Sequence, residues 1–209
     1  MYYGEKLNSI SHLVGAALAL IGLGALLSVA IQTRDPWVIT SFSVFGISMV
    51  LLYTMSTLYH SFSTPRLKYL FQIFDHISIY LLIAGTYTPY MLVTLRDANG
   101  WLIMGIIWSL AVVGILSEIF LSGGAVKIGQ MIIYVGMGWA CTFDFASLKM
   151  ALPETGLLWL TAGGLAYSAG VVFYILDKME KLTHAHGVWH FFVLTGTICH
   201  FISIIGYVR

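Results

Sequence analysis

The amino-acid sequence predicts an all-α polytopic membrane protein, a bundle of seven transmembrane helices, on the basis of three observations. Of its 209 residues, 59% are apolar and only 9% are charged, whereas soluble domains carry about 25% charged residues. The mean hydropathy is +0.89. The apolar residues fall into seven stretches, each close to the ~20 residues that a helix needs to cross a bilayer.

This composition excludes several classes of protein. Ten Lys and Arg residues and nine Asp and Glu residues cannot cover a water-soluble globule of this length. The formal net charge of +1 argues against a nucleic-acid binder, which needs a dense basic surface to neutralise phosphates. Alternation of polar and apolar residues is missing, so a transmembrane β-barrel is not expected. We therefore expect one membrane domain over residues 1–209, with membrane lipids as its partners and no nucleic acid.

Turn-forming and charged residues set the ends of the seven spans. We expect helices at about residues 10–31, 37–62, 70–94, 100–121, 127–147, 155–176 and 186–207. The segments that separate them are rich in Pro, Gly, Ser and charged residues, which favour turns: 32–36, 63–66, 96–100, 122–124, 149–154 and 177–183. Pro89 is expected to kink the third helix. Small residues such as Gly163 and Gly170 predict close packing of the sixth.

The distribution of basic residues predicts the orientation in the membrane. Seven spans place the two termini on opposite sides. The N-terminal side carries six basic residues and the opposite side carries four: Lys6, Arg66, Lys68, Lys127, Lys178 and Lys181 against Arg34, Arg96, Lys149 and Arg209. Because Lys and Arg accumulate in cytoplasmic loops, we expect a cytoplasmic N-terminus and an external C-terminus, in the cell's inner (plasma) membrane.

Ionisable residues inside spans are costly in lipid and therefore indicate function. They are His12, His60, Asp75, His76, Glu118, Asp144, His186, His190 and His200. His60 closes the second span, Asp75 opens the third, and His186 and His190 open the seventh. Because consecutive spans cross the membrane in opposite directions, these four residues lie at one face of the membrane, the face that carries the N-terminus.

The spacing of His186 and His190 predicts a metal site. Residues four apart share one helical face, with Cβ atoms about 5–6 Å apart, so both imidazoles can reach one cation. Catalytic zinc commonly takes three protein ligands, and His60 supplies a third nitrogen. Asp75 is expected nearby, and Ser56, one turn before His60, can support a ligand or contact a substrate. Two histidines near a helix end can also lie in the interfacial zone without a metal.

The remaining ionisable residues have structural interpretations. His200 lies ten residues past His190, about 15 Å along a helix, so we expect it to be a buried packing residue. His76 points away from Asp75 around the helix and is not expected to be a ligand. We expect Glu118 to pair with Lys127 or interfacial water, and Asp144 to be reached by water on the far side.

Glu5, Asn8 and His12 are spaced at helical turns where the first span begins. Capping and docking of the N-terminal segment is one interpretation. The alternative is that these residues line the entrance to the metal site.

Several strings of the sequence resemble one known family. Ser56–His60, Phe74–His76, His186–His190 and Cys199–Phe201 resemble motifs of the bacterial hemolysin III proteins, which belong with the progestin and adipoQ receptor family, including the adiponectin receptors. The resemblance implies a seven-helix fold with a cytoplasmic N-terminus. It also implies that His60, His186 and His190 bind zinc, that Asp75 contacts this zinc through water, and that Ser56 matches a serine of the wider hydrolase superfamily shared with alkaline ceramidases.

Three classes of function remain open. The first is a zinc-dependent hydrolase of a lipid amide such as ceramide, with Asp75 and Ser56 as catalytic residues. The second is a receptor, sensor or membrane-homeostasis protein in which the metal is structural. The third is a cytolytic pore or a transporter, which is disfavoured because the polar residues concentrate at one end of the spans instead of forming a stripe through them.

Overall fold

The protein, described over residues 4–208 by a computed structural model, confirms the predicted fold class. Its regular structure within these residues is entirely helical. Seven segments are long and apolar enough to cross a membrane: Lys6–Thr33, Pro36–Ser61, Pro65–Thr94, Gly100–Phe120, Gly124–Ala151, Glu154–Lys178 and Ala185–Tyr207. These segments indicate a multi-pass membrane protein.

The seven segments contain eight α-helices and two short helices of other types. The α-helices are α1 (Lys6–Thr33), α2 (Pro36–Ser61), α3 (Pro65–Pro89), α4 (Gly100–Phe120), α5 (Gly124–Gly138), α6 (Phe145–Ala151), α7 (Glu154–Lys178) and α8 (Ala185–Tyr207). A π-helical segment, η1 (Tyr90–Thr94), continues α3, and a 3₁₀-helix, η2 (Ala140–Asp144), connects α5 to α6.

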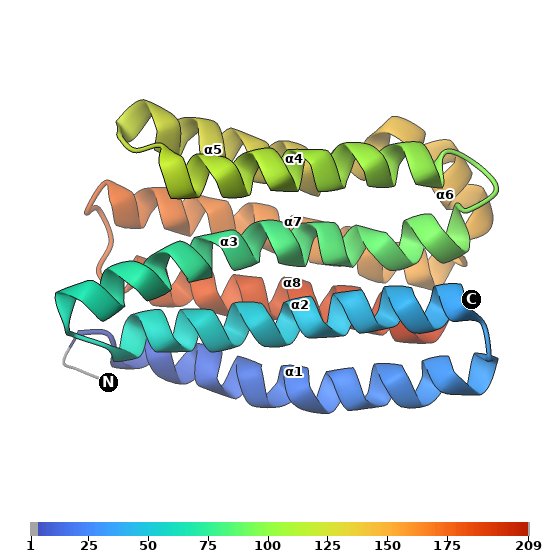
Figure 1. Cartoon of the computed structure of the whole chain (residues 1–209), viewed down its shortest axis with the longest axis horizontal. Helices are drawn as coiled ribbons and strands as arrows, with labels where there is room; N and C mark the ends of the chain where they lie inside the picture. Colours follow the sequence, from blue (N-terminus) through green and yellow to red (C-terminus); the bar gives the residue numbers. More distant parts are fainter. Residues whose placement is uncertain (1–3, 209) are drawn as a thin grey trace.

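Short turns make consecutive spans antiparallel. Arg34 ends α1 in the left-handed region with φ of 56°, and the Asp35 carboxylate accepts a hydrogen bond from the Trp37 backbone N–H at 2.8 Å. Pro36 and Pro65 occupy the first turns of α2 and α3, where a missing N–H costs nothing. The N-terminus and the α2–α3, α4–α5 and α7–α8 connections consequently lie at one end of the bundle, and the C-terminus lies at the other (Figure 1).

Two of the departures from the expected ranges, those of the third and fifth spans, change the description of the molecule. α3 begins at Pro65 instead of about residue 70, so Asp75 lies ten residues, or about 15 Å of helix, from its start and does not open the helix. The fifth span is not one continuous helix but α5, η2 and α6.

At Pro89 the third span changes from α to π geometry, with the Leu95 N–H bonded to the Tyr90 carbonyl at 2.8 Å. A proline has no N–H to continue the α-helical ladder, which accounts for this change.

Close approach of α7 and α8 follows from their small residues, as predicted. A Cβ atom added to Gly163 would collide with the His200 ring, and one added to Gly170 would lie 2.9 Å from Phe192 Cβ. On α8, a Cβ atom added to Gly196 would likewise collide with the Tyr167 ring. The resulting contact fixes α8, and with it His186 and His190, against its neighbour.

Candidate metal centre

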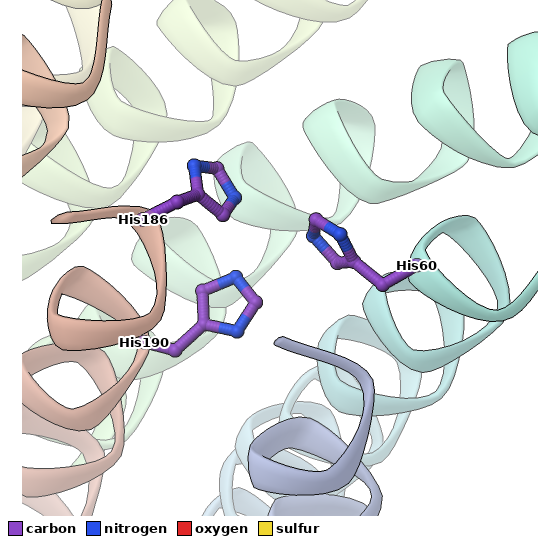
Figure 2. Close-up of side chains that lie close together, drawn as sticks. All are labelled: His60, His186 and His190. Carbon is purple, nitrogen blue, oxygen red and sulfur yellow. The ribbon is translucent and has the colours of Figure 1, made fainter. Parts of the chain in front are cut away.

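Three histidines from two helices converge at the end of the bundle that carries the N-terminus. His60 is the penultimate residue of α2, and His186 and His190 lie on the first two turns of α8. One ligand nitrogen from each ring lies within 4.8 Å of the other two. The ring centroids are 4.9–5.1 Å apart, and the close-up shows the rings grouped around a common space (Figure 2). We call His60, His186 and His190 the three-histidine cluster.

Each ring of the cluster is oriented by a hydrogen bond at Nδ1. His60 Nδ1 donates to Glu5 Oε2 at 2.6 Å, and His186 Nδ1 donates to Asp177 Oδ2 at 3.1 Å. His190 Nδ1 donates to the Asn8 backbone carbonyl at 3.2 Å. Carboxylate and carbonyl oxygens can only accept, so all three rings carry their proton on Nδ1. This arrangement fixes the tautomer, as is usual for metal-binding histidines.

The three Nε2 atoms are left as free acceptors. All three are buried and have no hydrogen-bond partner, a costly state for buried polar atoms. Neutral imidazole nitrogens are common ligands of zinc and other transition metals. The cluster could therefore hold a metal ion, which would satisfy all three Nε2 atoms at once.

Glu5 supports the cluster from the residue that precedes α1. Its side chain makes no capping hydrogen bond, so the capping interpretation is wrong for this residue. Its carboxylate instead contacts His60, accepts from Asn8 Nδ2 at 2.8 Å and accepts from Lys68 Nζ at 3.2 Å. Burial raises the pKa of Glu5, but the hydrogen bonds from His60 and Asn8 and the nearby charge of Lys68 lower it from 4.5 to about 2.

Glu5→Gln is expected to weaken metal affinity by about 10–100-fold, the effect usual for removing a carboxylate that supports a ligand. The substitution keeps the side-chain shape but removes the charge that makes His60 a more basic ligand. Competitive titration with a chromophoric chelator measures the affinity. Glu154→Gln, the same change at the opposite end of the bundle, serves as the control and should leave affinity unchanged. Equal affinities for the two variants would contradict this role of Glu5.

Ser56 and Asp75 lie beside the cluster, outside the set of nitrogens that could share an ion. Both are buried, with 1% and 6% of their surfaces exposed. The Ser56 hydroxyl is close enough to the Asp75 carboxyl to interact with it, and the His60 ring is near enough to influence this carboxyl electrostatically. A buried hydroxyl of α2 and a buried carboxyl of α3 therefore lie next to the cluster.

His12 belongs to the same site, which the sequence offered only as an alternative. Its ring stacks on His190 with centroids 3.6 Å apart and an angle of 9° between the planes. Its Nδ1 forms a 2.7 Å hydrogen bond with Ser56 Oγ, and its buried Nε2 has no partner. The signal that could have found it is its helical spacing from Glu5 and Asn8, both of which support the cluster.

The other ionisable residues lie outside the cluster. Glu118 contacts His76 Nδ1 at 2.6 Å, across the contact between α3 and α4. Its hydrogen-bond partner is therefore His76, whereas Lys127 or interfacial water was expected. His200 is the expected packing residue, and its Nε2 donates to the Leu160 carbonyl at 3.2 Å. Asp144 accepts from Asn99 Nδ2 at 2.9 Å on an exposed surface at the far end.

Comparisons with known proteins identify the family of this chain. Residues 2–201 match the family described as haemolysin-III related. The chain is 41% identical to Hemolysin-3 of Bacillus cereus, over 98% of this chain and 91% of the relative. It is 38% identical to the Hemolysin-3 homolog of Bacillus subtilis (strain 168), over 97% and 93%. A human relative, the monocyte to macrophage differentiation factor, is 27% identical over 97% of this chain and 83% of its own length. This chain, a membrane protein of seven spans with three converging histidines, belongs to the haemolysin-III related family.

Proposed function

We propose that this protein is a zinc-dependent hydrolase of a membrane lipid amide, with a ceramide-like substrate. The observation that carries the proposal is the combination of three unpaired Nε2 atoms with a buried carboxylate and hydroxyl beside them. His60, His186 and His190 would hold the zinc. Three protein ligands leave a position open, as in catalytic zinc sites.

Zinc bound at this cluster would supply a Lewis acid that polarises a carbonyl and lowers the pKa of water from 15.7 toward about 7. Asp75 would orient the attacking water and accept its proton at a carboxylate oxygen. The Ser56 hydroxyl would donate a hydrogen bond to the carbonyl oxygen as negative charge develops there. His12 Nδ1, which contacts Ser56 Oγ, would hold this hydroxyl in position.

The reaction balances without another reagent. The water oxygen forms a bond to the amide carbon, and the carbon–nitrogen bond breaks. The proton held by Asp75 passes to the leaving nitrogen, so the products are a fatty acid and an amine. A long-chain amide suits the location, because the cluster lies among helices whose outer surfaces are apolar.

A non-catalytic metal centre in a receptor or sensor is the second candidate. The observation that favours it is that the ligands come from α2 and α8, so a metal would fasten two helices that are far apart in the sequence. A pore, which the names of the bacterial relatives suggest, has less support, because the unpaired histidine nitrogens gather mainly at one end of the bundle.

Incubation of the zinc-loaded protein in nanodiscs with a total lipid extract tests the proposal. Mass spectrometry is expected to detect a fatty acid and an amine released from an amide lipid. Chelation should stop the release, and added zinc should restore it. Zinc-loaded protein that hydrolyses no lipid in this assay would contradict the enzymatic proposal and leave the structural metal centre in its place.

We also propose that the N-terminus and the three-histidine cluster lie on the cytoplasmic side, on the basis of the basic residues at that end. A reporter active only in the periplasm or outside the cell is expected to work when fused after Arg209, and to be silent when fused before Met1. A cytoplasmic reporter should give the reverse pattern. Cytoplasmic activity of the fusion after Arg209 would contradict this orientation.

A further inference from the structure

A cavity of about 260 Å³ lies between the end of α3, η1, the broken fifth span, α7 and α8. Its wall is mostly apolar, with Met91, Leu148 and Leu160 among the lining residues. His200 lines it too, ten residues beyond His190 and therefore about 15 Å along α8 from the cluster. No member of the three-histidine cluster lines this cavity.

Two buried polar atoms in this wall have no hydrogen-bond partner: His200 Nδ1 and Tyr90 Oη. His200 Nε2 donates to the Leu160 carbonyl, so Nδ1 is an acceptor with a free lone pair. The Ser203 hydroxyl near Tyr90 donates to the Gly156 carbonyl at 2.7 Å. Tyr90 Oη itself has no hydrogen-bond partner, so the Tyr90 hydroxyl can donate to a ligand. His200 is 9% exposed and Tyr90 is 3% exposed.

The cavity is accessible from the outer surface of the bundle. Trp139 and Phe145, which line it, are 40% and 44% exposed. Trp139 Nε1 donates to Ser168 Oγ at 3.1 Å, a contact between the fifth span and α7. A molecule dissolved in the membrane could therefore enter laterally between the fifth span and α7.

We propose that this cavity binds a single-chain lipid with an uncharged hydroxyl headgroup, at a site separate from the three-histidine cluster. A hydroxyl can donate to His200 Nδ1 and accept from Tyr90 Oη, which matches the two unpaired atoms. A carboxylate can only accept, so it would leave His200 Nδ1 unsatisfied and would be buried without a cation, since the lining residues include no Lys or Arg. The apolar wall would take the alkyl chain.

Photolabelling with a diazirine-bearing fatty alcohol tests the proposal on the full chain in nanodiscs. Labelling should map to peptides of η1, η2, α7 or α8 that line the cavity. Unlabelled 1-dodecanol should compete, and dodecanoic acid should compete about tenfold less well. Tyr90→Phe, which removes only the hydroxyl, and His200→Phe, which removes Nδ1, should each weaken competition about fivefold to tenfold.

Gly164→Leu and Gly24→Leu provide a matched pair. A Cβ added at either glycine has no atom within 4 Å, so both variants should fold, which thermal unfolding verifies. Gly164 lines the cavity and Gly24 is exposed on α1. Gly164→Leu should therefore abolish saturable labelling, whereas Gly24→Leu should leave it unchanged. Labelling that does not saturate, equal competition by the acid, or full labelling of folded Gly164→Leu would each overturn the proposal.

Discussion

His190→Ala is expected to abolish stoichiometric zinc binding and to lower the Tm by about 5–10 °C. His190 is fully buried, and its ring contacts those of His12 and His186, so its removal leaves only two nitrogens of the three-histidine cluster to hold the ion. Zinc present at 100 times its Kd stabilises a protein by about 2.7 kcal/mol, and each kcal/mol corresponds to about 2–4 °C in a chain of this size. Metal analysis of the purified variant and thermal unfolding measure the two effects.

A chelator distinguishes the fall in Tm caused by loss of the metal from the fall caused by loss of a buried ring. The Tm of the wild-type protein should fall by a similar amount when the chelator is added, and the Tm of His190→Ala should not change. His200→Ala is the matched control, because it removes another buried histidine from α8 that lies outside the cluster. It should lower the Tm yet retain one zinc per chain. Full metal occupancy of His190→Ala would show that the cluster is not the binding site.

Asp75→Asn is expected to lower the rate of lipid amide hydrolysis by about 10²–10⁴-fold, the range typical of removing a general base. Asparagine keeps the size of the side chain and its place beside Ser56, but it has no carboxylate to accept a proton. Metal content should remain unchanged, because Asp75 lies outside the three-histidine cluster. The rate is measured by mass spectrometry of the released fatty acid, with zinc determined on the same samples.

Asp144→Asn is the control for the chemical change itself. Asp144 lies at the other end of the bundle, where its partner is Asn99, so this variant should hydrolyse lipid at the wild-type rate. If Asp75→Asn is as active as wild type while zinc is retained, Asp75 is not the proton acceptor. If Asp75→Asn loses its zinc, Asp75 has a structural role in the metal site.

Much of this architecture could be predicted because lipid restricts what a sequence can do. The seven apolar stretches could only be helices, and antiparallel threading brought His60, His186 and His190 to one end without any knowledge of side-chain contacts. Helical spacing then placed His186 and His190 on one face. These features depend only on the period of the helix and the thickness of the membrane.

The features that could not be predicted depend on packing between helices. The start of α3 at Pro65 determines how far Asp75 lies from the end of the helix. Hydropathy did not reveal this start, because residues 65–70 are of mixed polarity. His12 joins the site only because α1 packs against α2 and α8, which brings its ring onto His190. Likewise, Glu118 pairs with His76 across α3 and α4, a contact between helices that sequence spacing does not report.

X-ray absorption at the zinc edge of the purified protein tests the central claim most directly. The account predicts one zinc per chain with three imidazole nitrogens at about 2.0–2.1 Å and no fourth protein nitrogen, and His60→Ala should remove this signature. Four imidazole nitrogens would contradict it, because the fourth, most readily His12, would close the position that hydrolysis requires. Absence of stoichiometric metal after zinc loading would contradict the metal centre itself.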